Sequence, residues 1–184
     1  MNSVNNKCIL IVDMINDFVN GKFGNEEALK TVKKTEETLS KLNKKIKIIF
    51  AKDSHIKNDP EFNVWGEHAI DNSYSSEIVN ELKEFPDYTI KKRHYDAFFD
   101  TDLDSLLRVL NIKKMYIFGI STDICVLHTC AGAFYRYYDV SVVSDLCSSI
   151  DKDNHLMALK NIKINYGYNA ISSEELIKEV NENE

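Results

Sequence analysis

The sequence predicts an α/β protein, a three-layer sandwich in which a mostly parallel central sheet of about six strands has helices on both faces. Short apolar runs of strand length alternate along the 184 residues with longer segments whose apolar side chains recur every three or four positions. Strands that alternate with helices are joined by right-handed crossovers, which make the strands parallel and place the helices over the sheet. Reactive side chains also follow the strands, as in sheets that bind ligands beyond the carboxyl ends of their strands.

The first half of the chain contains three predicted strands and one predicted helix. The apolar runs Cys8–Asp13 and Ile46–Ala51 are typical of strands buried on both faces, and Tyr88–Ile90 indicates a short third strand. An apolar stripe at helical spacing over residues 28–42 predicts an amphipathic helix. The polar stretch Lys52–Ser73 has little periodicity, and a loop of that length is usually functional or disordered.

The second half continues the alternation of strands and helices. Thr101 and Asp104 have the spacing of a capping box, which predicts a helix that begins there. Ser172 and Glu175 have the same spacing and predict a last helix. The other expected elements are strands at Met115–Ile120, Val140–Val143 and Asn169–Ile171, and helices after Cys125 and over Asn154–Asn161.

Composition limits the classes of function. Hydrophobic residues make up 43% of the chain and charged residues 28%, ordinary globular values, and we expect one domain over residues 1–184. A formal net charge of −6 argues against a nucleic-acid surface, and no apolar run fits a signal peptide or a membrane span. The four cysteines have no CxxC spacing, so a reducing cytoplasm is the expected compartment.

Four reactive residues come directly after predicted strands. Asp13 ends the first strand, and the next three strands are followed in turn by Asp53, Lys92 and Cys125. The carboxyl ends of parallel strands meet at one edge of a sheet, where such proteins bind ligands. We therefore expect two carboxylates, an amine and a thiol to lie together at that edge.

Cys125 is expected in the first turn of a helix, because Ser121–Cys125 joins a buried strand to an apolar stripe at helical spacing. Unpaired backbone N–H groups and the helix dipole favour an anion there. Such surroundings lower the pKa of a thiol and make a thiolate nucleophile, although Asp123 in the same turn offsets part of this effect. The alternative is a buried cysteine that serves only as a small apolar side chain.

The polar loop after the second strand carries side chains that bind metals. Asp53 and His55 are two residues apart, so in an extended segment they point to the same side. The loop is long enough for Glu61 and His68 to fold back toward them. Two imidazoles and two carboxylates suit Zn²⁺, Mn²⁺ or Fe²⁺ better than Ca²⁺ or Mg²⁺. The spacing therefore predicts one divalent transition metal, with solvated polar side chains as the alternative.

Four segments, in order and over nearly the whole chain, match known motifs. Asp13–Phe18 is similar to D-x-Q-N-D-F, with Ile15 where Gln is usual. Lys91–Leu103 is similar to K-R-x-Y-x-A-F-x-x-T-D-L, and Gly119–Val126 to G-V-x-T-D-x-C-V. With the loop Asp53–His68, these segments resemble the nicotinamidases of the isochorismatase-like cysteine hydrolase superfamily.

The resemblance implies a catalytic triad of Asp13, Lys92 and Cys125. In that mechanism the Cys125 thiolate attacks an amide carbonyl, while Asp13 takes up the thiol proton and passes it on. Lys92 supplies a fixed positive charge beside both groups. The resemblance also implies a cis peptide between Ile120 and Ser121, which would direct the backbone N–H groups of Ser121 and Cys125 toward the oxyanion.

The implied reaction converts nicotinamide to nicotinate and ammonia, a step of NAD salvage, and pyrazinamide would also be a substrate. The metal, Zn²⁺ before Mn²⁺ or Fe²⁺, would bind the pyridine nitrogen and position the ring. Related enzymes are often dimers or tetramers, so a homo-oligomer is expected. The implied metal ligands are Asp53, His55, Glu61 and His68, and the implied ring-pocket residues are Phe18, Trp65 and Tyr95.

Three other functions stay open at this point. A related cysteine amidase that acts on a carbamoyl or maleamate-type amide would keep the triad without needing a metal, and the metal loop argues against it. A non-enzymatic scaffold would keep only the fold, and the presence of Asp13, Lys92 and Cys125 argues against that function. Isochorismatase-type hydrolysis of a vinyl ether proceeds without the cysteine, which is present here.

Overall fold

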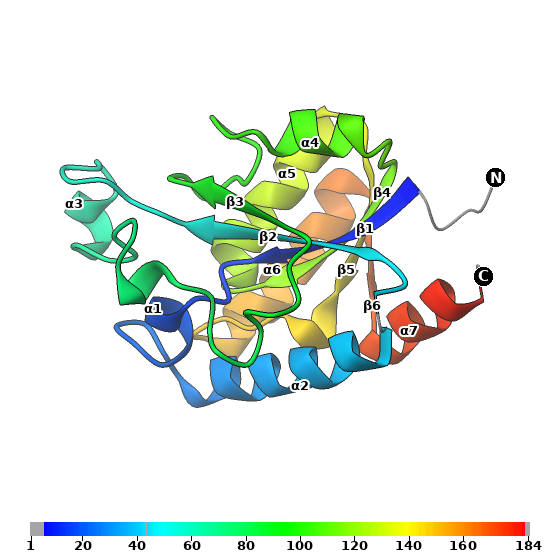
Figure 1. Ribbon diagram of the computed structural model, residues 1–184, viewed down its shortest axis with the longest axis horizontal. Helices are drawn as coiled ribbons and strands as arrows, with labels where there is room; N and C mark the ends of the chain where they lie inside the picture. The colour runs from blue at the N-terminus through cyan, green and yellow to red at the C-terminus, as the bar shows by residue number, and fades with distance from the viewer. Residues whose placement is uncertain (1–5, 43, 183–184) are drawn as a thin grey trace.

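The predicted fold class is confirmed: the computed structural model, which describes residues 6–42 and 44–182, contains a parallel sheet of six strands with helices on both faces (Figure 1). The strand order is β3-β2-β1-β4-β5-β6. The strands are β1 (Lys7–Val12), β2 (Lys47–Asp53), β3 (Tyr88–Lys92), β4 (Lys114–Gly119), β5 (Asp139–Val143) and β6 (Asn169–Ile171).

The helices cover the sheet in two layers. α2 and α7 pack together on one face, and α5 packs with α6 on the other (Figure 1). The helices are α1 (Asn16–Val19), α2 (Glu26–Leu42), α3 (Phe62–Trp65), α4 (Leu103–Val109), α5 (Leu127–Tyr135), α6 (Lys152–Tyr166) and α7 (Ser173–Asn181). Short turns of other helical types are η2 (Tyr74–Ser76), η3 (Thr122–Val126) and η4 (Ser144–Leu146).

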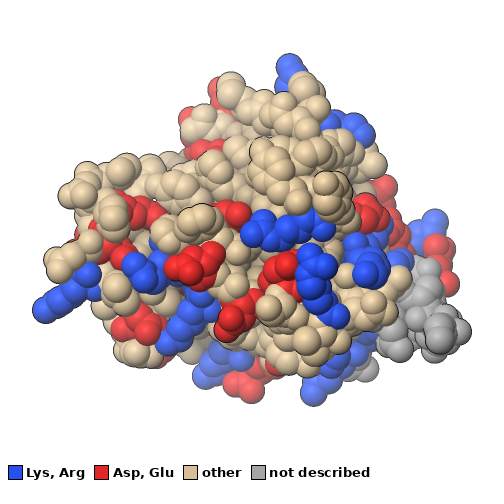
Figure 2. All heavy atoms as spheres, turned by 90° about the horizontal axis from the view of Figure 1, so that it is seen from above, with Lys and Arg blue, Asp and Glu red and all other residues tan. Residues whose placement is uncertain are grey.

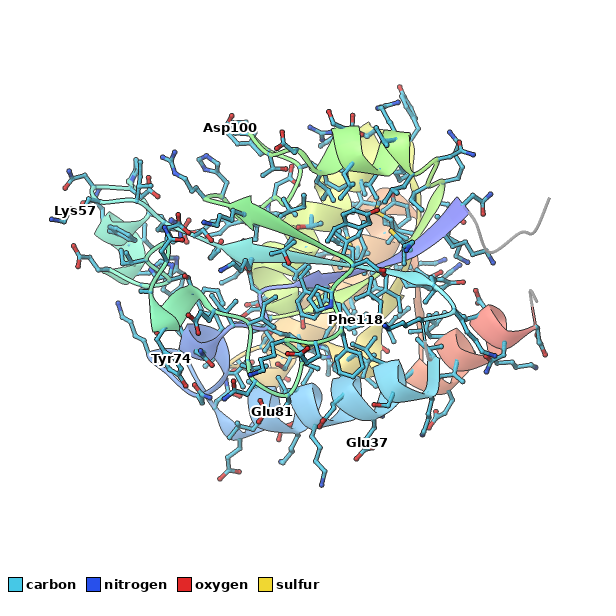
Figure 3. All side chains as sticks on the ribbon, viewed as in Figure 1. Glu37, Lys57, Tyr74, Glu81, Asp100 and Phe118 are labelled. Atoms are coloured by element: carbon cyan, nitrogen blue, oxygen red, sulfur yellow. The ribbon has the colours of Figure 1, made fainter. Side chains whose placement is uncertain are left out.

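The core lies between the sheet and these two layers. All residues from Cys8 to Val12 in β1 are fully buried, which explains the uninterrupted apolar run of that strand. Phe118 of β4 lies between the sheet and α2, whereas Glu37 points away from the outer side of α2 (Figure 3). Apolar area removed from water on both faces is the main force that holds the three layers together.

Charged side chains of both signs are mixed on the surface. Seen from above, Lys and Arg side chains lie among Asp and Glu side chains rather than forming a field of one sign (Figure 2). The face in that view therefore lacks the broad basic patch that a nucleic-acid backbone would require.

Two helices begin as local sequence signals suggest. Ser172 and Glu175 form the predicted capping box of α7. α6 is longer than the predicted Asn154–Asn161, because the Asp151 side chain accepts hydrogen bonds from two backbone N–H groups at its start and Gly167 ends it with φ 76°.

Two expectations about helix starts are wrong. The capping box of Thr101 and Asp104 does not form: α4 starts after Asp102 without a side-chain cap. Instead, the Thr101 hydroxyl donates to Ala97 O at 2.6 Å and accepts from the N–H of Leu103 at 3.2 Å. Cys125 lies in the π-helical turn η3, ahead of α5, rather than in the first turn of an α-helix.

Candidate active site

Adjacent strands end side by side at the edge where the reactive residues were expected. Asp53 and Lys92 are paired at the ends of β2 and β3. Asp13 directly follows β1, and its N–H donates to Ala51 O of β2 at 2.9 Å. The Asp13 carboxylate in turn accepts the N–H of Asp53 at 2.7 Å. Backbone contacts between strands thus place three of the four side chains.

The end of β4 approaches β1 so closely that only glycine fits. A Cβ atom on Gly119 would lie 1.9 Å from Val12 O, and its φ of 142° is one that other residues rarely adopt. The chain then turns through Ile120 and Ser121, whose shared peptide bond is cis as the resemblance implied. This path carries Cys125 over the end of β1.

The structure brings Asp13, Lys92 and Cys125 together in a buried cluster. Nζ of Lys92 lies 2.7 Å from Oδ2 of Asp13 and 3.6 Å from Sγ of Cys125. It also lies 2.5 Å from Oδ1 of Asp53 and donates to His94 O at 3.1 Å. Their exposed fractions are 0% for Asp13, 1% for Lys92 and 5% for Cys125.

Burial and crowding of charge shift the pKa values in this cluster. Burial, helped by repulsion from Asp53, raises the pKa of Asp13 to about 7, although Lys92 acts in the opposite direction. Burial would also raise the pKa of Asp53, but Lys92 and His55 outweigh it and leave that pKa lowered. Asp13 therefore combines the basicity and the position of a proton acceptor near neutral pH.

The expectation of a lowered thiol pKa is wrong. Burial raises the pKa of Cys125 well above its usual value, more than the positive charge of Lys92 lowers it, and the carboxylates of Asp13 and Asp53 raise it further. The effect of the helical turn on the thiol pKa is outweighed because the sulfur is shielded from water. The resting side chain is a thiol, so a nucleophilic role requires that a neighbour accept its proton.

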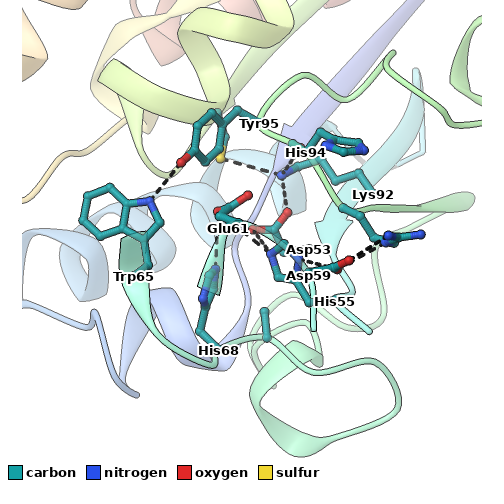
Figure 4. A network of polar contacts seen from close by, with 12 residues as sticks. Asp53, His55, Asp59, Glu61, Trp65, His68, Lys92, His94 and Tyr95 are labelled. Carbon is teal, nitrogen blue, oxygen red and sulfur yellow. Dashed lines mark hydrogen bonds and ion pairs between the residues drawn. The ribbon is translucent and has the colours of Figure 1, made fainter. Parts of the chain in front are cut away.

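The four predicted metal ligands also lie together. One ligand atom each from Asp53, His55, Glu61 and His68 lies within 4.8 Å of the others. Nε2 of His68 is 3.5 Å from Oε1 of Glu61, and Nε2 of His55 is 3.6 Å from Oδ2 of Asp53 (Figure 4). Among the described residues, this Nε2 of His55 is buried without a hydrogen-bond partner.

An unpaired buried nitrogen between carboxylates fits a bound cation. Burial would lower the pKa of His55, but Asp53, Asp59 and Glu61 raise it, so the cluster favours positive charge at this place. Two imidazoles and two carboxylates are a donor set for a divalent transition metal. The side chains present thus fit the expected kind of ion.

Each histidine of this cluster is held at its other ring nitrogen. Nδ1 of His68 donates to Gly66 O at 2.8 Å, and Nδ1 of His55 lies 3.0 Å from Oδ2 of Asp59. Arg93 binds Asp59 through two hydrogen bonds and, against the effect of burial, helps lower the pKa of that carboxyl to about 2. Both rings therefore direct Nε2 into the cluster, the arrangement common for metal-binding histidines.

A pocket of about 60 Å³ opens above the two clusters. The three aromatic residues expected around the substrate ring, Phe18, Trp65 and Tyr95, all line it, and Nε1 of Trp65 donates to Oη of Tyr95 at 2.9 Å (Figure 4). Ser121 and Cys125, the expected oxyanion donors, lie in its wall, beside the candidate ligands Asp53, Glu61 and His68. The remaining lining residues are Phe23, Asn25, Ile120, Ile124 and Ile150.

Sequence reasoning missed several of these residues. Asp59 and Arg93 pair across 34 positions of the chain, and Phe23 and Ile150 reach the pocket from separate loops. The sequence did contain a signal that Arg93 and Asp59 lie near the site: Arg93 directly follows Lys92, and Asp59 lies four positions after His55.

Comparison with known proteins now identifies the class. The isochorismatase domain model matches residues 7–175, and the chain belongs to this family of isochorismatase-like hydrolases. No helix within residues 6–42 and 44–182 has the length and apolar character needed to cross a membrane.

Three solved structures show which members the chain resembles. N-carbamoylsarcosine amidase from Thermoplasma acidophilum is 31% identical, with a TM-score of 0.83 over 91% of this chain and 96% of that one. The nicotinamidase PncA from Bacillus subtilis is 27% identical, with a TM-score of 0.81 over 91% and 99%. The pyrazinamidase of Pyrococcus horikoshii, solved in complex with zinc, is 27% identical, with a TM-score of 0.83 over 91% and 99%.

Proposed function

We propose that this protein is a nicotinamidase that hydrolyses nicotinamide to nicotinate and ammonia through a thioester on Cys125. The observation that carries the proposal is the double role of Asp53. One of its oxygens binds Lys92 of the candidate triad, and the other faces His55 of the candidate metal cluster. A nucleophile and a metal-binding group therefore lie side by side at one pocket.

The proposed chemistry divides amide hydrolysis into two steps. Sγ of Cys125 attacks the amide carbon as its proton passes to the carboxylate of Asp13, and the same proton then leaves with the amine as ammonia. In the second step Asp13 takes a proton from water, whose oxygen attacks the thioester, and gives that proton to the departing Sγ; the acid that forms loses its remaining proton to solvent as nicotinate. Lys92, buried and 3.6 Å from Sγ, stabilises the thiolate while it forms.

Two further groups bind and orient the substrate in this proposal. The backbone N–H groups of Ser121 and Cys125 would stabilise the oxyanion. Phe18, Trp65 and Tyr95 would contact the flat ring. Asp53, His55, Glu61 and His68 would hold one divalent ion, Zn²⁺ before Mn²⁺ or Fe²⁺, which when bound offers the pyridine nitrogen a Lewis-acid partner.

A second candidate is a related amidase for a carbamoyl or maleamate-type amide, and the similarity to N-carbamoylsarcosine amidase favours it. Substrates of that kind carry a carboxylate, which needs a cationic partner. Among the lining residues that the structure describes, Asp53 and Glu61 are acidic and none is Lys or Arg. Apart from the proposed metal ion, these residues offer a carboxylate no cationic partner, which favours an uncharged ring amide such as nicotinamide or pyrazinamide.

The proposal extends to the setting of the enzyme. Cys8, Cys125, Cys130 and Cys147 are all free, which fits a reducing cytoplasm. Large exposed apolar side chains such as Met157 and Ile164 on α6 fit a homo-oligomer.

Ammonia release from nicotinamide, pyrazinamide, an N-carbamoyl amino acid and maleamate, with and without a chelator, tests this function. We expect turnover of the first two, loss of that turnover with the chelator, and no turnover in a Cys125→Ala variant that keeps its circular dichroism spectrum. Turnover retained by Cys125→Ala would refute the covalent mechanism. Turnover confined to the carboxylate-bearing amides would establish the second candidate instead.

A further inference from the structure

The loop after α1 binds the backbone of the segment Trp65–His68. The ammonium group of Lys22 donates to the carbonyl oxygen of Trp65 at 2.6 Å and to that of Glu67 at 2.9 Å. Lys22 and Trp65 are 43 positions apart in the sequence. The loop after α1 passes near α3 at one end of the molecule (Figure 1). This contact fixes the two carbonyl groups.

The carbonyl group of Gly66, which lies between those of Trp65 and Glu67 in the sequence, binds a candidate metal ligand instead of Lys22. Gly66 O accepts the hydrogen bond from Nδ1 of His68 at 2.8 Å. Because Nδ1 is the donor, Nε2 carries the free lone pair of the neutral ring, and this atom lies 3.5 Å from Oε1 of Glu61. The orientation of the Gly66 carbonyl therefore decides where His68 presents its lone pair.

The absence of a side chain at Gly66 leaves room for the Lys22 ammonium group. Gly66 has φ 71°, and a Cβ atom there would lie 2.9 Å from Nζ of Lys22. The ammonium group also lies 5.1 Å from the centre of the Phe23 ring. A larger residue at position 66 would displace the ammonium group from its two acceptors.

α1 and the loop after it also contact His68 and its neighbour Ala69. Oδ2 of buried Asp17 accepts the N–H of Ala69 at 2.7 Å. The rings of Phe18 and Phe23 lie 5.9 and 5.4 Å from the His68 ring. With Lys22, these contacts form a support for His68 that is built from a different part of the chain.

We propose that Lys22 is a positioning residue for the metal site, an inference that rests on the proposed function. Lys22 holds the carbonyl groups of Trp65 and Glu67, and thereby leaves the Gly66 carbonyl directed at His68. Outer partners of metal-binding histidines typically contribute 10- to 100-fold to metal affinity. Lys22 acts through the backbone rather than on the ring itself, so we expect an effect near the lower limit, about tenfold.

Zinc dissociation constants from chelator competition test this role. Lys22→Met keeps an unbranched side chain over Phe23 but removes the donor, whereas Lys22→Arg keeps two donors. Lys30→Met is the matched control, because Lys30 is an exposed lysine whose ion pair is with Glu27. We expect about tenfold weaker zinc binding in Lys22→Met, recovery in Lys22→Arg and no change in Lys30→Met.

A second readout needs neither metal nor substrate. Trp65 is the only tryptophan of the chain, so fluorescence of the metal-free protein reports on this loop. We expect Lys22→Met to shift the emission and increase quenching by iodide, while Lys30→Met leaves both unchanged.

The outcomes separate this inference from the function on which it rests. A wild-type protein that binds no divalent ion overturns both the metal site and the role of Lys22. Zinc binding by the wild type that Lys22→Met leaves unchanged overturns the role of Lys22 alone. Equal losses of zinc affinity in Lys22→Met and Lys30→Met, or zinc affinity that is not recovered in Lys22→Arg, would also contradict the role of Lys22.

Discussion

The ring of His55 is held at one nitrogen and lacks a hydrogen-bond partner at the other, among the residues described. Nδ1 faces Asp59 at 3.0 Å, and buried Nε2 faces the candidate metal cluster. A buried polar atom without a partner costs free energy, and a bound metal ion would remove that cost. Sequence spacing predicted His55 as a ligand, but Asp59 depends on a three-dimensional contact that spacing does not reveal.

Asp59→Asn tests that contact at the scale of one residue. The substitution removes the charge that holds the His55 ring and pairs with Arg93. We expect zinc binding to weaken about 10- to 100-fold, measured by chelator competition. Asp71→Asn, in the same loop, changes a carboxylate whose ion pair is with Lys91, and should bind zinc like the wild type. Equal affinities for Asp59→Asn and the wild type would show that the contact does not support the metal site.

Two glycines at element ends differ in what a side chain would meet. A Cβ atom added to Gly119 would collide with Val12 O at 1.9 Å. A Cβ atom added to Gly167, whose φ is 76°, would have no neighbouring atom within 4 Å. We expect Gly167→Ala to lower the free energy of unfolding by about 1–2 kcal/mol, the cost of a left-handed conformation. Gly119→Ala should cost more than about 3 kcal/mol, because two backbones must separate. Urea unfolding of both variants measures these losses. Equal losses in the free energy of unfolding for Gly167→Ala and Gly119→Ala would contradict the ranking.

Asp145 connects three elements through one carboxylate. It accepts two hydrogen bonds from Ser173 at the start of α7 and pairs with Lys34 of α2 at 2.7 Å. Burial would raise the pKa of Asp145, but Lys34 and Ser173 lower it. A lowered folded-state pKa adds stability above the unfolded value of about 4, and this stability is lost as the pH falls through the folded value.

Asp145→Asn should therefore destabilise the protein in a pH-dependent way. At pH 7 we expect the free energy of unfolding to fall by about 1–2 kcal/mol, a modest value because both partners are partly exposed. The difference from the wild type should shrink below about pH 4, where the carboxylate becomes protonated. Urea titrations at pH 7, 5 and 3.5 measure the difference in free energy of unfolding between Asp145→Asn and the wild type. A difference that stays constant across this pH range would contradict the charge-based explanation.

Local signals predict some elements and miss others for identifiable reasons. The capping box of α7 formed because the Ser172 and Glu175 side chains each accept the backbone N–H of the other residue at the start of the helix. The capping box expected at α4 did not form because the Thr101 hydroxyl, held by its donation to Ala97 O, accepts the N–H of Leu103 and not that of Asp104. The π turn at Cys125 depends on Val126 N–H bonding back to Ser121 O, a choice that sequence periodicity does not distinguish from an α-helix.

At the scale of the whole molecule, the fold and the meeting point of the site follow from the order of the strands. Parallel strands with apolar runs place their carboxyl ends at one edge, so the proximity of Asp13, Lys92 and Cys125 could be anticipated. The thiol pKa could not, because it depends on how completely the layers exclude water. The support for His68 by the loop after α1 also requires the assembled molecule.

A metal ion held by two histidines and two carboxylates should stabilise the entire fold, because the unfolded chain lacks the assembled site. At a free zinc concentration one hundred times the dissociation constant, binding adds about 2.7 kcal/mol. For a chain of 184 residues this raises Tm by roughly 5–10 °C, measured by calorimetry with zinc and with a chelator. His68→Ala is the control, because His68 belongs to the proposed site but not to the second acidic group of Asp13, Asp53 and Cys125. If zinc raised Tm equally in His68→Ala, the ion would be bound elsewhere; a rise confined to the wild type would locate it at the group that contains His68.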